Sequence, residues 1–113
     1  MDDELRKHPR VSGYAKALFL ESATPGYIRD LSLSGCQIAF MQAVAAAVGD
    51  LINVRVIAEH DQGIAPFDLC LRVRWVKPDA IWQALGGEIE SLRCPEGKAP
   101  FEKLVAYYAG EGG

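Results

Sequence analysis

The feature that most constrains the fold is a strict alternation of apolar and polar residues between Phe67 and Trp75. Every second position in this stretch is apolar, and Asp68, Arg72 and Arg74 are among the residues between them. A period of two places alternate side chains on opposite faces of a β-strand. We therefore predict a strand over residues 67–75 with one face in the core, and Trp75 falls on that core face.

Short β-type segments surround this strand and are separated by residues that favour turns. Turns are predicted over residues 22–26, at Ser34-Gly35 and at Pro78-Asp79. The pair Gly86-Gly87 interrupts the last segment, as at a β-bulge or a barrel corner. The predicted strands besides 67–75 cover residues 14–21, 27–33, 36–40, 51–58 and 81–91.

The C-terminal segment changes to a helical period. Apolar residues from Phe101 to Tyr108 recur at the spacing i, i+3, i+4 and i+7, which is typical of an amphipathic helix. We predict a helix over about 99–109 that docks on the barrel, with Pro100 at its first position and Gly110 just past its end. Six strands followed by one helix indicate a mainly β protein, a small six-stranded antiparallel barrel with a C-terminal helix.

Length and composition limit the possible classes of protein. With 113 residues, the chain is long enough for one domain with a hydrophobic core. The longest apolar run, residues 43–48, is too short to span a bilayer. The acidic start of the sequence, residues 1–4, does not resemble a secretory signal. We therefore expect a cytoplasmic protein without a membrane span, in which residues 12–109 form the barrel and helix and residues 110–113 a disordered tail.

The cysteines and the net charge exclude further classes. Cys36, Cys70 and Cys94 are odd in number and have no CxxC spacing, which argues against a disulfide framework and against a zinc or other metal site. The net charge is −3, so no broad basic field is available for DNA or RNA. No catalytic motif is present, and we expect neither an enzyme nor a bound cofactor.

Two arginines in the first eleven residues form the first candidate binding motif. Arg6 and Arg10 make an RxxxR pair in a polar segment that Pro9 keeps extended. Residues four apart in an extended chain lie on the same side, so two guanidinium forks can converge on one anionic ligand. Each fork can grip a phosphate or the O6 and N7 atoms of guanine. We therefore expect residues 1–11 to form a flexible N-terminal arm that carries this RxxxR pair. The alternative is that the basic arm is only solvated.

The second motif is DxSxxG, with Asp30, Ser32 and Gly35. In a strand, Asp30 and Ser32 share one face while Leu31 and Leu33 anchor the other face in the core. The carboxylate accepts hydrogen bonds from donors such as guanine N1–H and N2–H₂, and glycine permits a positive φ and a close backbone approach. The alternative is a cluster that only forms a turn.

Secondary candidates accompany these motifs. Lys7 and His8 lie inside the RxxxR segment. Trp75 has the chemistry to stack on a base, although core packing explains it more simply. Arg72 and Arg74 share a strand face. They either extend a basic binding site or only belong to the outer surface of the barrel.

Together, these motifs ahead of a β-rich body resemble the PilZ domain family. The matching residues are Arg6, Arg10, Asp30, Ser32 and Gly35, and the later pattern LRVRWV…LGGEIE is similar as well. The resemblance implies a split-barrel receptor domain for cyclic di-GMP, which often acts as an adaptor on a downstream effector protein. The resemblance also implies that the residue before the arginine motif influences nucleotide stoichiometry. That residue is Leu5 here, so the sequence does not decide whether one or two nucleotides bind per chain.

The resemblance predicts a mechanism and leaves alternatives. We expect the Arg6–Arg10 arm to close over nucleotide docked against Asp30, Ser32 and Gly35. The first alternative is a protein-interaction module of the same fold that binds no nucleotide. The second is a small barrel that binds RNA or single strands, which the acidic balance disfavours. Neither the oligomeric state nor any movement of the helix follows from the sequence.

Overall fold

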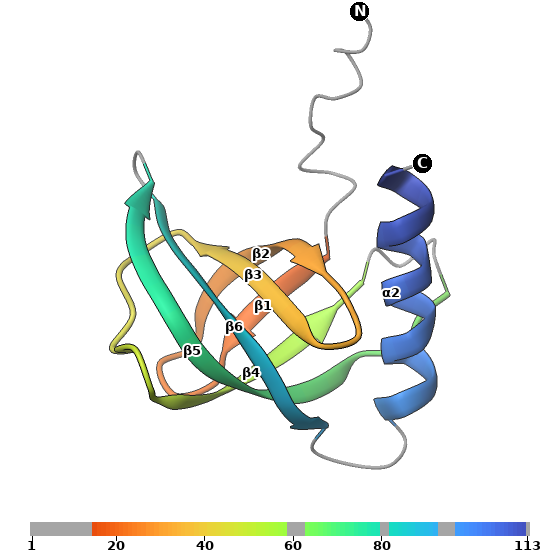
Figure 1. Ribbon diagram of the computed structural model, residues 1–113, viewed down its shortest axis with the longest axis horizontal. Helices are drawn as coiled ribbons and strands as arrows, with labels where there is room; N and C mark the ends of the chain where they lie inside the picture. Colours follow the sequence, from red (N-terminus) through yellow and green to blue (C-terminus); the bar gives the residue numbers. More distant parts are fainter. Residues whose placement is uncertain (1–14, 59–62, 80–81, 93–96, 113) are drawn as a thin grey trace, which may run out of the picture.

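The structure is a computed structural model that describes residues 15–58, 63–79, 82–92 and 97–112. These residues form six antiparallel strands and one helix beside them (Figure 1). The elements are β1 (Lys16–Phe19), β2 (Thr24–Leu31), β3 (Gly35–Phe40), β4 (Leu51–Ile57), β5 (Phe67–Asp79), β6 (Trp82–Leu92) and α2 (Lys98–Gly112).

The strands close into a barrel with the order β1-β2-β3-β6-β5-β4. β4 pairs with β1, so every strand has two antiparallel neighbours and no open edge remains. The predicted mainly β barrel with a C-terminal helix is therefore confirmed. Alternate residues of the strands fill its interior, as the period of two predicts. The largest fully buried side chains are Phe19, Phe40, Ile28, Ile38, Leu69, Leu71, Leu85, Leu104, Val54, Val56 and Val73.

The first predicted turn lies elsewhere in the structure. β2 already begins at Thr24, so Pro25 and Gly26 are strand residues, and the chain reverses over residues 20–23. Ala23 takes the left-handed conformation there, with φ 56°. Pro25 has no N–H, but its carbonyl still accepts a hydrogen bond from Met41 at 3.1 Å. Continued pairing on this side therefore outweighs the turn preference of Pro25-Gly26.

The turn predicted at Pro78-Asp79 is also wrong. Pro78 pairs with Gln83 and Asp79 with Trp82, so β5 and β6 form a longer hairpin than expected. Its connection, at residues 80–81, lies outside the described residues. A proline near the end of a strand costs at most one ladder hydrogen bond, which explains why it did not end the strand.

Helix α2 covers the barrel through the predicted apolar stripe. Phe101 and Leu104 are buried, and the Phe101 ring meets the Phe67 ring edge-on at a centroid distance of 5.9 Å. Pro100 is the third helical residue and not the first, and the helix continues through Gly110 to Gly112. Residues 110–112 are thus helical where a disordered tail was predicted. Within the described ranges, no helix has both the length and the apolar character to cross a bilayer.

Candidate ligand-binding face

Four residues on neighbouring strands form a row on the outer surface of the barrel. Asp30 of β2 pairs with Gln37 of β3, Gln37 with Gly86 of β6, and Gly86 with Trp75 of β5. Residues directly opposite each other in paired strands share a face of the sheet. Asp30 and Gln37 are exposed and Trp75 is partly exposed. We call Asp30, Gln37, Gly86 and Trp75 the outer row.

A β-bulge in β2 turns Asp30 outward. Ile28 pairs with Ile38 and Asp30 with Gln37, which leaves Arg29 as an extra residue. Ile28 and Leu31 both point into the core, although they are three positions apart and a regular strand would place them on opposite faces. Without the bulge, the register that buries Ile28 would direct the Asp30 carboxylate into the core.

Ser32 and Gly35 shape the β2–β3 hairpin. The Ser32 hydroxyl accepts hydrogen bonds from the backbone N–H of Gly35 at 3.1 Å and of Ser34 at 3.4 Å. The Ser32 N–H also donates to the Gly35 carbonyl at 2.9 Å. The motif therefore does form a turn, as the alternative interpretation predicted. It leaves Ser32 exposed beside Asp30.

One expectation for this motif is wrong, and one of the two possible roles of Gly35 is excluded. Leu33 does not anchor in the core, because it lies in the hairpin turn between Ser32 and Ser34 and its side chain is 67% exposed. Gly35 does not have a positive φ. A Cβ at Gly35 would instead lie 3.1 Å from the Gly87 carbonyl oxygen, so close approach of β6 is what favours glycine there.

Trp75 lies on the outer face, which corrects its predicted place in the core. Val73 pairs with Gly87 and Trp75 with Gly86, so Arg74 is a bulge residue and reverses the alternation after Val73. A Cβ on Gly86 would lie only 2.6 Å from the Trp75 indole. The indole thus occupies the space above Gly86 and extends along the outer row. The bulge predicted at the glycine pair is present, but the extra residue belongs to the opposite strand.

A cation covers the Trp75 ring. Lys77 Nζ lies 5.4 Å from the ring centroid, within the usual range of a cation–π interaction.

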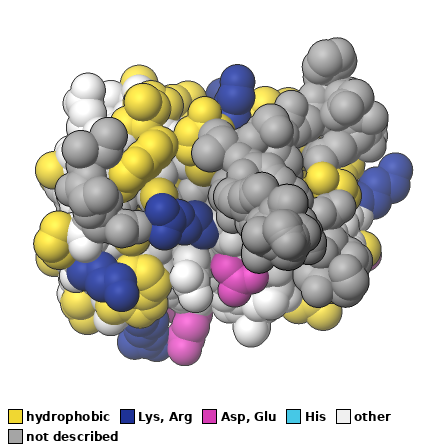
Figure 2. Space-filling model, turned by 90° about the horizontal axis from the view of Figure 1, so that it is seen from above, with side chains coloured by type: hydrophobic (Ala, Val, Ile, Leu, Met, Phe, Trp, Pro, Cys, Tyr) yellow, Lys and Arg dark blue, Asp and Glu magenta, His cyan; other side chains and the backbone are white. Residues whose placement is uncertain are grey.

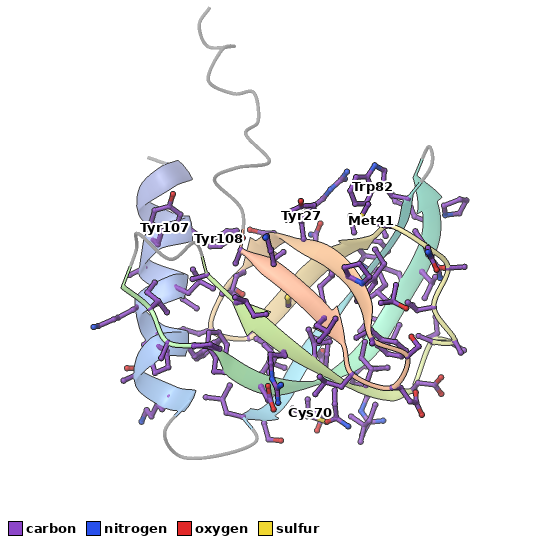
Figure 3. All side chains as sticks on the ribbon, turned by 180° about the vertical axis from the view of Figure 1, so that it is seen from behind. Tyr27, Met41, Cys70, Trp82, Tyr107 and Tyr108 are labelled. Carbon is purple, nitrogen blue, oxygen red and sulfur yellow. The ribbon has the colours of Figure 1, made fainter. Side chains whose placement is uncertain are left out.

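A second aromatic pair lies near the β5–β6 hairpin. Tyr27 and Trp82 pack together, with ring centroids 5.9 Å apart, and Figure 3 shows both on the same side of the barrel as Met41. Seen from above, apolar side chains gather toward the β5–β6 hairpin with basic and acidic ones beside them (Figure 2).

Arg72 and Arg74 are engaged in ion pairs. Arg74 donates to Glu88 at 2.8 Å, and Arg72 donates to Glu90 at 3.0 Å. The hydrogen bond from Arg74, and then its charge, lower the pKa of Glu88 below its usual value. Of the two readings of this arginine pair, a paired outer surface fits these contacts better than an extension of a basic site.

Sequence reasoning missed Gln37 and Lys77. Neither belongs to a motif. Gln37 lies opposite Asp30 across the β2–β3 hairpin and opposite Gly86 of β6, and Lys77 follows Trp75 by two residues on β5 and lies over its ring. Arg6, Lys7, His8 and Arg10 lie outside the described residues. The first described residue, Ala15, accepts a hydrogen bond from the Ile28 N–H at 2.8 Å. The N-terminal segment therefore joins the barrel beside β2, two residues from Asp30.

Comparison with known proteins agrees with this architecture. The family model described as PilZ domain matches residues 4–108, nearly the whole chain and both motifs. Neither the curated proteins nor the solved structures contained a significant match. PilZ domains are binding and adaptor domains rather than catalysts. The chain belongs to the PilZ domain family, a family of cyclic di-GMP receptors.

Proposed function

We propose that this chain is a non-catalytic cyclic di-GMP receptor whose nucleotide docks on the outer row, under the arginines of the N-terminal segment. The observation that carries the proposal is the outer row itself. It places a carboxylate on β2 and an aromatic ring on β5 along one exposed line of the barrel. Adjacent strands are about 4.8 Å apart and the indole lies over Gly86. Asp30 and the ring are therefore about two strand spacings, roughly 10 Å, apart, a distance that a nucleobase and its sugar can span.

Each group has a defined chemical role in the proposal. The Asp30 carboxylate accepts hydrogen bonds from N1–H and N2–H₂ of guanine. Once the Lys77 side chain turns away from the Trp75 ring, the ring offers a stacking surface, which is worth about 1–3 kcal/mol per base in single-stranded nucleotide sites. Ser32 donates or accepts beside Asp30, and the tight hairpin at Gly35 keeps the two side chains together.

Arg6 and Arg10 supply the positive charge for the phosphates. The outer row itself contains a carboxylate but no cation, and Lys77 beside Trp75 supplies a single positive charge. A doubly anionic ligand therefore requires further cations. Arg10 precedes Ala15 by five residues, a span of at most about 17 Å when extended. Because Ala15 lies next to Ile28, Arg10 is within reach of the outer row. We propose that this segment becomes ordered over the bound nucleotide.

Isothermal titration calorimetry with cyclic di-GMP tests the proposal. A charged hydrogen bond contributes about 1.5–3 kcal/mol, so Arg10→Ala and Asp30→Ala should each weaken binding by about tenfold to a hundredfold. Lys103→Ala, an exposed change on α2, is the control and should bind like the wild type. Wild-type protein that takes up no cyclic di-GMP would refute the receptor function. The same titration gives the number of nucleotides per chain.

Hydrogen exchange tests the ordering step separately. Amides of residues 5–11 should gain protection when cyclic di-GMP is added. Equal protection with and without nucleotide would contradict closure of the segment, even if the nucleotide binds.

A protein-interaction function is the second candidate, and an apolar surface next to the outer row favours it. Met41 is 52% exposed, and a nearby cavity of 340 Å³ is lined by Trp82, Val76 and Pro78 among others. An exposed apolar patch of this kind suits contact with an effector protein. In an adaptor, nucleotide binding and protein interaction coexist. If the chain does not bind nucleotide, protein interaction would be its only function of the two. A cytoplasmic location and the absence of a cofactor stay predictions.

A further inference from the structure

We propose that Gln37 is a base-reading residue, which donates its side-chain amide to O6 of the guanine whose N1–H and N2–H₂ edge is held by Asp30. The inference rests on the proposed function and assigns base selectivity within the same site. Gln37 belongs to neither motif, and its role follows from strand pairing.

The position of Gln37 is fixed by both neighbouring strands. It pairs with Asp30 on one side and with Gly86 on the other. Directly opposite residues have Cβ atoms about 4.5–5.5 Å apart, so the Gln37 amide and the Asp30 carboxylate emerge side by side. The Trp75 indole fills the place of a Gly86 side chain. A base stacked on that indole therefore presents its edge to Gln37 and Asp30 together.

The two side chains complement the edge of guanine. That edge carries an acceptor, O6, followed by two donors, N1–H and N2–H₂. An amide offers donors as well as an acceptor, whereas a carboxylate accepts only. Gln37 can therefore donate to O6 while Asp30 accepts from both donors. Adenine has an amino donor in place of O6 and a bare N1, which would face the Asp30 carboxylate without a hydrogen.

Within the described part of the chain, no contact requires the Gln37 side chain. It is exposed, and among the described residues it has no side-chain hydrogen bond. Gln83 differs, because the oxygen of its side-chain amide accepts a hydrogen bond from the Val44 backbone N–H at 3.0 Å. That hydrogen bond holds the loop between β3 and β4. A substitution at Gln37 should thus alter ligand binding and leave the fold intact.

The test compares Gln37→Glu and Gln37→Ala with Gln42→Glu and Gln42→Ala. Gln42 is an exposed glutamine beyond the end of β3, so its variants carry the same change in charge and size outside the outer row. Gln37→Ala should weaken binding of cyclic di-GMP about threefold to tenfold, the range for one neutral hydrogen bond. Gln37→Glu should weaken it at least tenfold, because a carboxylate then faces O6. Both Gln42 variants should bind like the wild type.

A second ligand shows which edge each residue reads. Cyclic di-IMP keeps O6 and N1–H but lacks the N2 amino group. Gln37→Glu should therefore lose the same factor with both ligands, whereas Asp30→Ala should lose less with cyclic di-IMP than with cyclic di-GMP.

The outcomes separate this inference from the proposed function. Wild-type protein without cyclic di-GMP binding would remove both. Binding by the wild type together with equal affinities for the Gln37 and Gln42 variants would overturn only the role of Gln37. Equal losses of Asp30→Ala with the two ligands would overturn the assignment of the edge. If Gln37→Glu does not fold, as judged by circular dichroism, Gln37→Ala decides the question.

Discussion

The hydroxyl of Tyr108 is inserted into the β1–β2 ladder, where it donates to the carbonyl of Ile28. It also accepts from the Ala15 N–H at 3.0 Å. Ala15 and Ile28 would otherwise exchange both backbone hydrogen bonds, but only the one from the Ile28 N–H to the Ala15 carbonyl is direct. A residue of α2 therefore connects the place where the N-terminal segment enters the barrel with the bulge before Asp30.

Tyr108→Phe should lower the free energy of unfolding by about 1–3 kcal/mol, because two partly buried backbone groups lose their partner. Urea denaturation followed by circular dichroism measures the change. Tyr107→Phe removes the same atom from the neighbouring half-buried residue. Among the described residues the Tyr107 hydroxyl makes no hydrogen bond, so this change should cost less than about 0.5 kcal/mol. Equal effects of the two variants would contradict the role of the inserted hydroxyl.

Gly86→Ala should disturb Trp75 more than the fold. The new Cβ would meet the indole at 2.6 Å, and overpacking of this kind typically costs about 1–3 kcal/mol. A side chain can move away, so the cost should largely vanish in a Trp75→Ala background. A double-mutant cycle on the free energy of unfolding measures this coupling.

Gly87→Ala serves as the contrast in the same experiment. Its Cβ would lie 2.0 Å from the Arg72 backbone oxygen, which cannot rotate away. Trp75→Ala should not rescue this variant. Rescue of both alanine variants, or of neither, would contradict the described place of the indole.

Arg74→Ala should raise the pKa of Glu88 toward its usual value, because the hydrogen bond and the charge that lower it are lost. A carboxylate with a lowered pKa in the folded state adds stability above the pKa of the unfolded chain, and this contribution is lost as the pH falls through the folded-state value. Removing Arg74 should therefore reduce the dependence of stability on pH in the acidic range. Nuclear magnetic resonance titration of the Glu88 carboxyl carbon measures the shift. An unchanged Glu88 pKa would mean that the pair does not form in solution.

Cys36 should resist alkylation in the folded protein. Its burial, and to a smaller degree the charge of Asp30, raise the pKa of the thiol far above the neutral range, and only the thiolate reacts readily. Cys70 is partly exposed on β5 and should be labelled first by iodoacetamide at pH 8. The measurement is mass spectrometry of a Cys94→Ser variant over time. Labelling of Cys36 as fast as Cys70 without unfolding would argue against the described interior.

The sequence alone determined the type of fold and the motifs. The alternation over residues 67–75 and the apolar stripe from Phe101 to Tyr108 express local periods of 2 and 3.6 residues. Such periods do not depend on which strands become neighbours. The RxxxR and DxSxxG residues are also local patterns, and together, ahead of a β-rich body, they were enough to indicate the family.

The tertiary structure decided which side chains meet. Extra residues at Arg29 and Arg74 reverse the alternation and turn Asp30 and Trp75 outward. A bulge arises from the register between two paired strands, and a single strand does not contain that information. For the same reason Trp75 was predicted in the core and Gln37 was overlooked. The β2–β3 hairpin sets Gln37 opposite Asp30, and only the pairing of β3 with β6, strands far apart in sequence, brings Trp75 of β5 into one row with them.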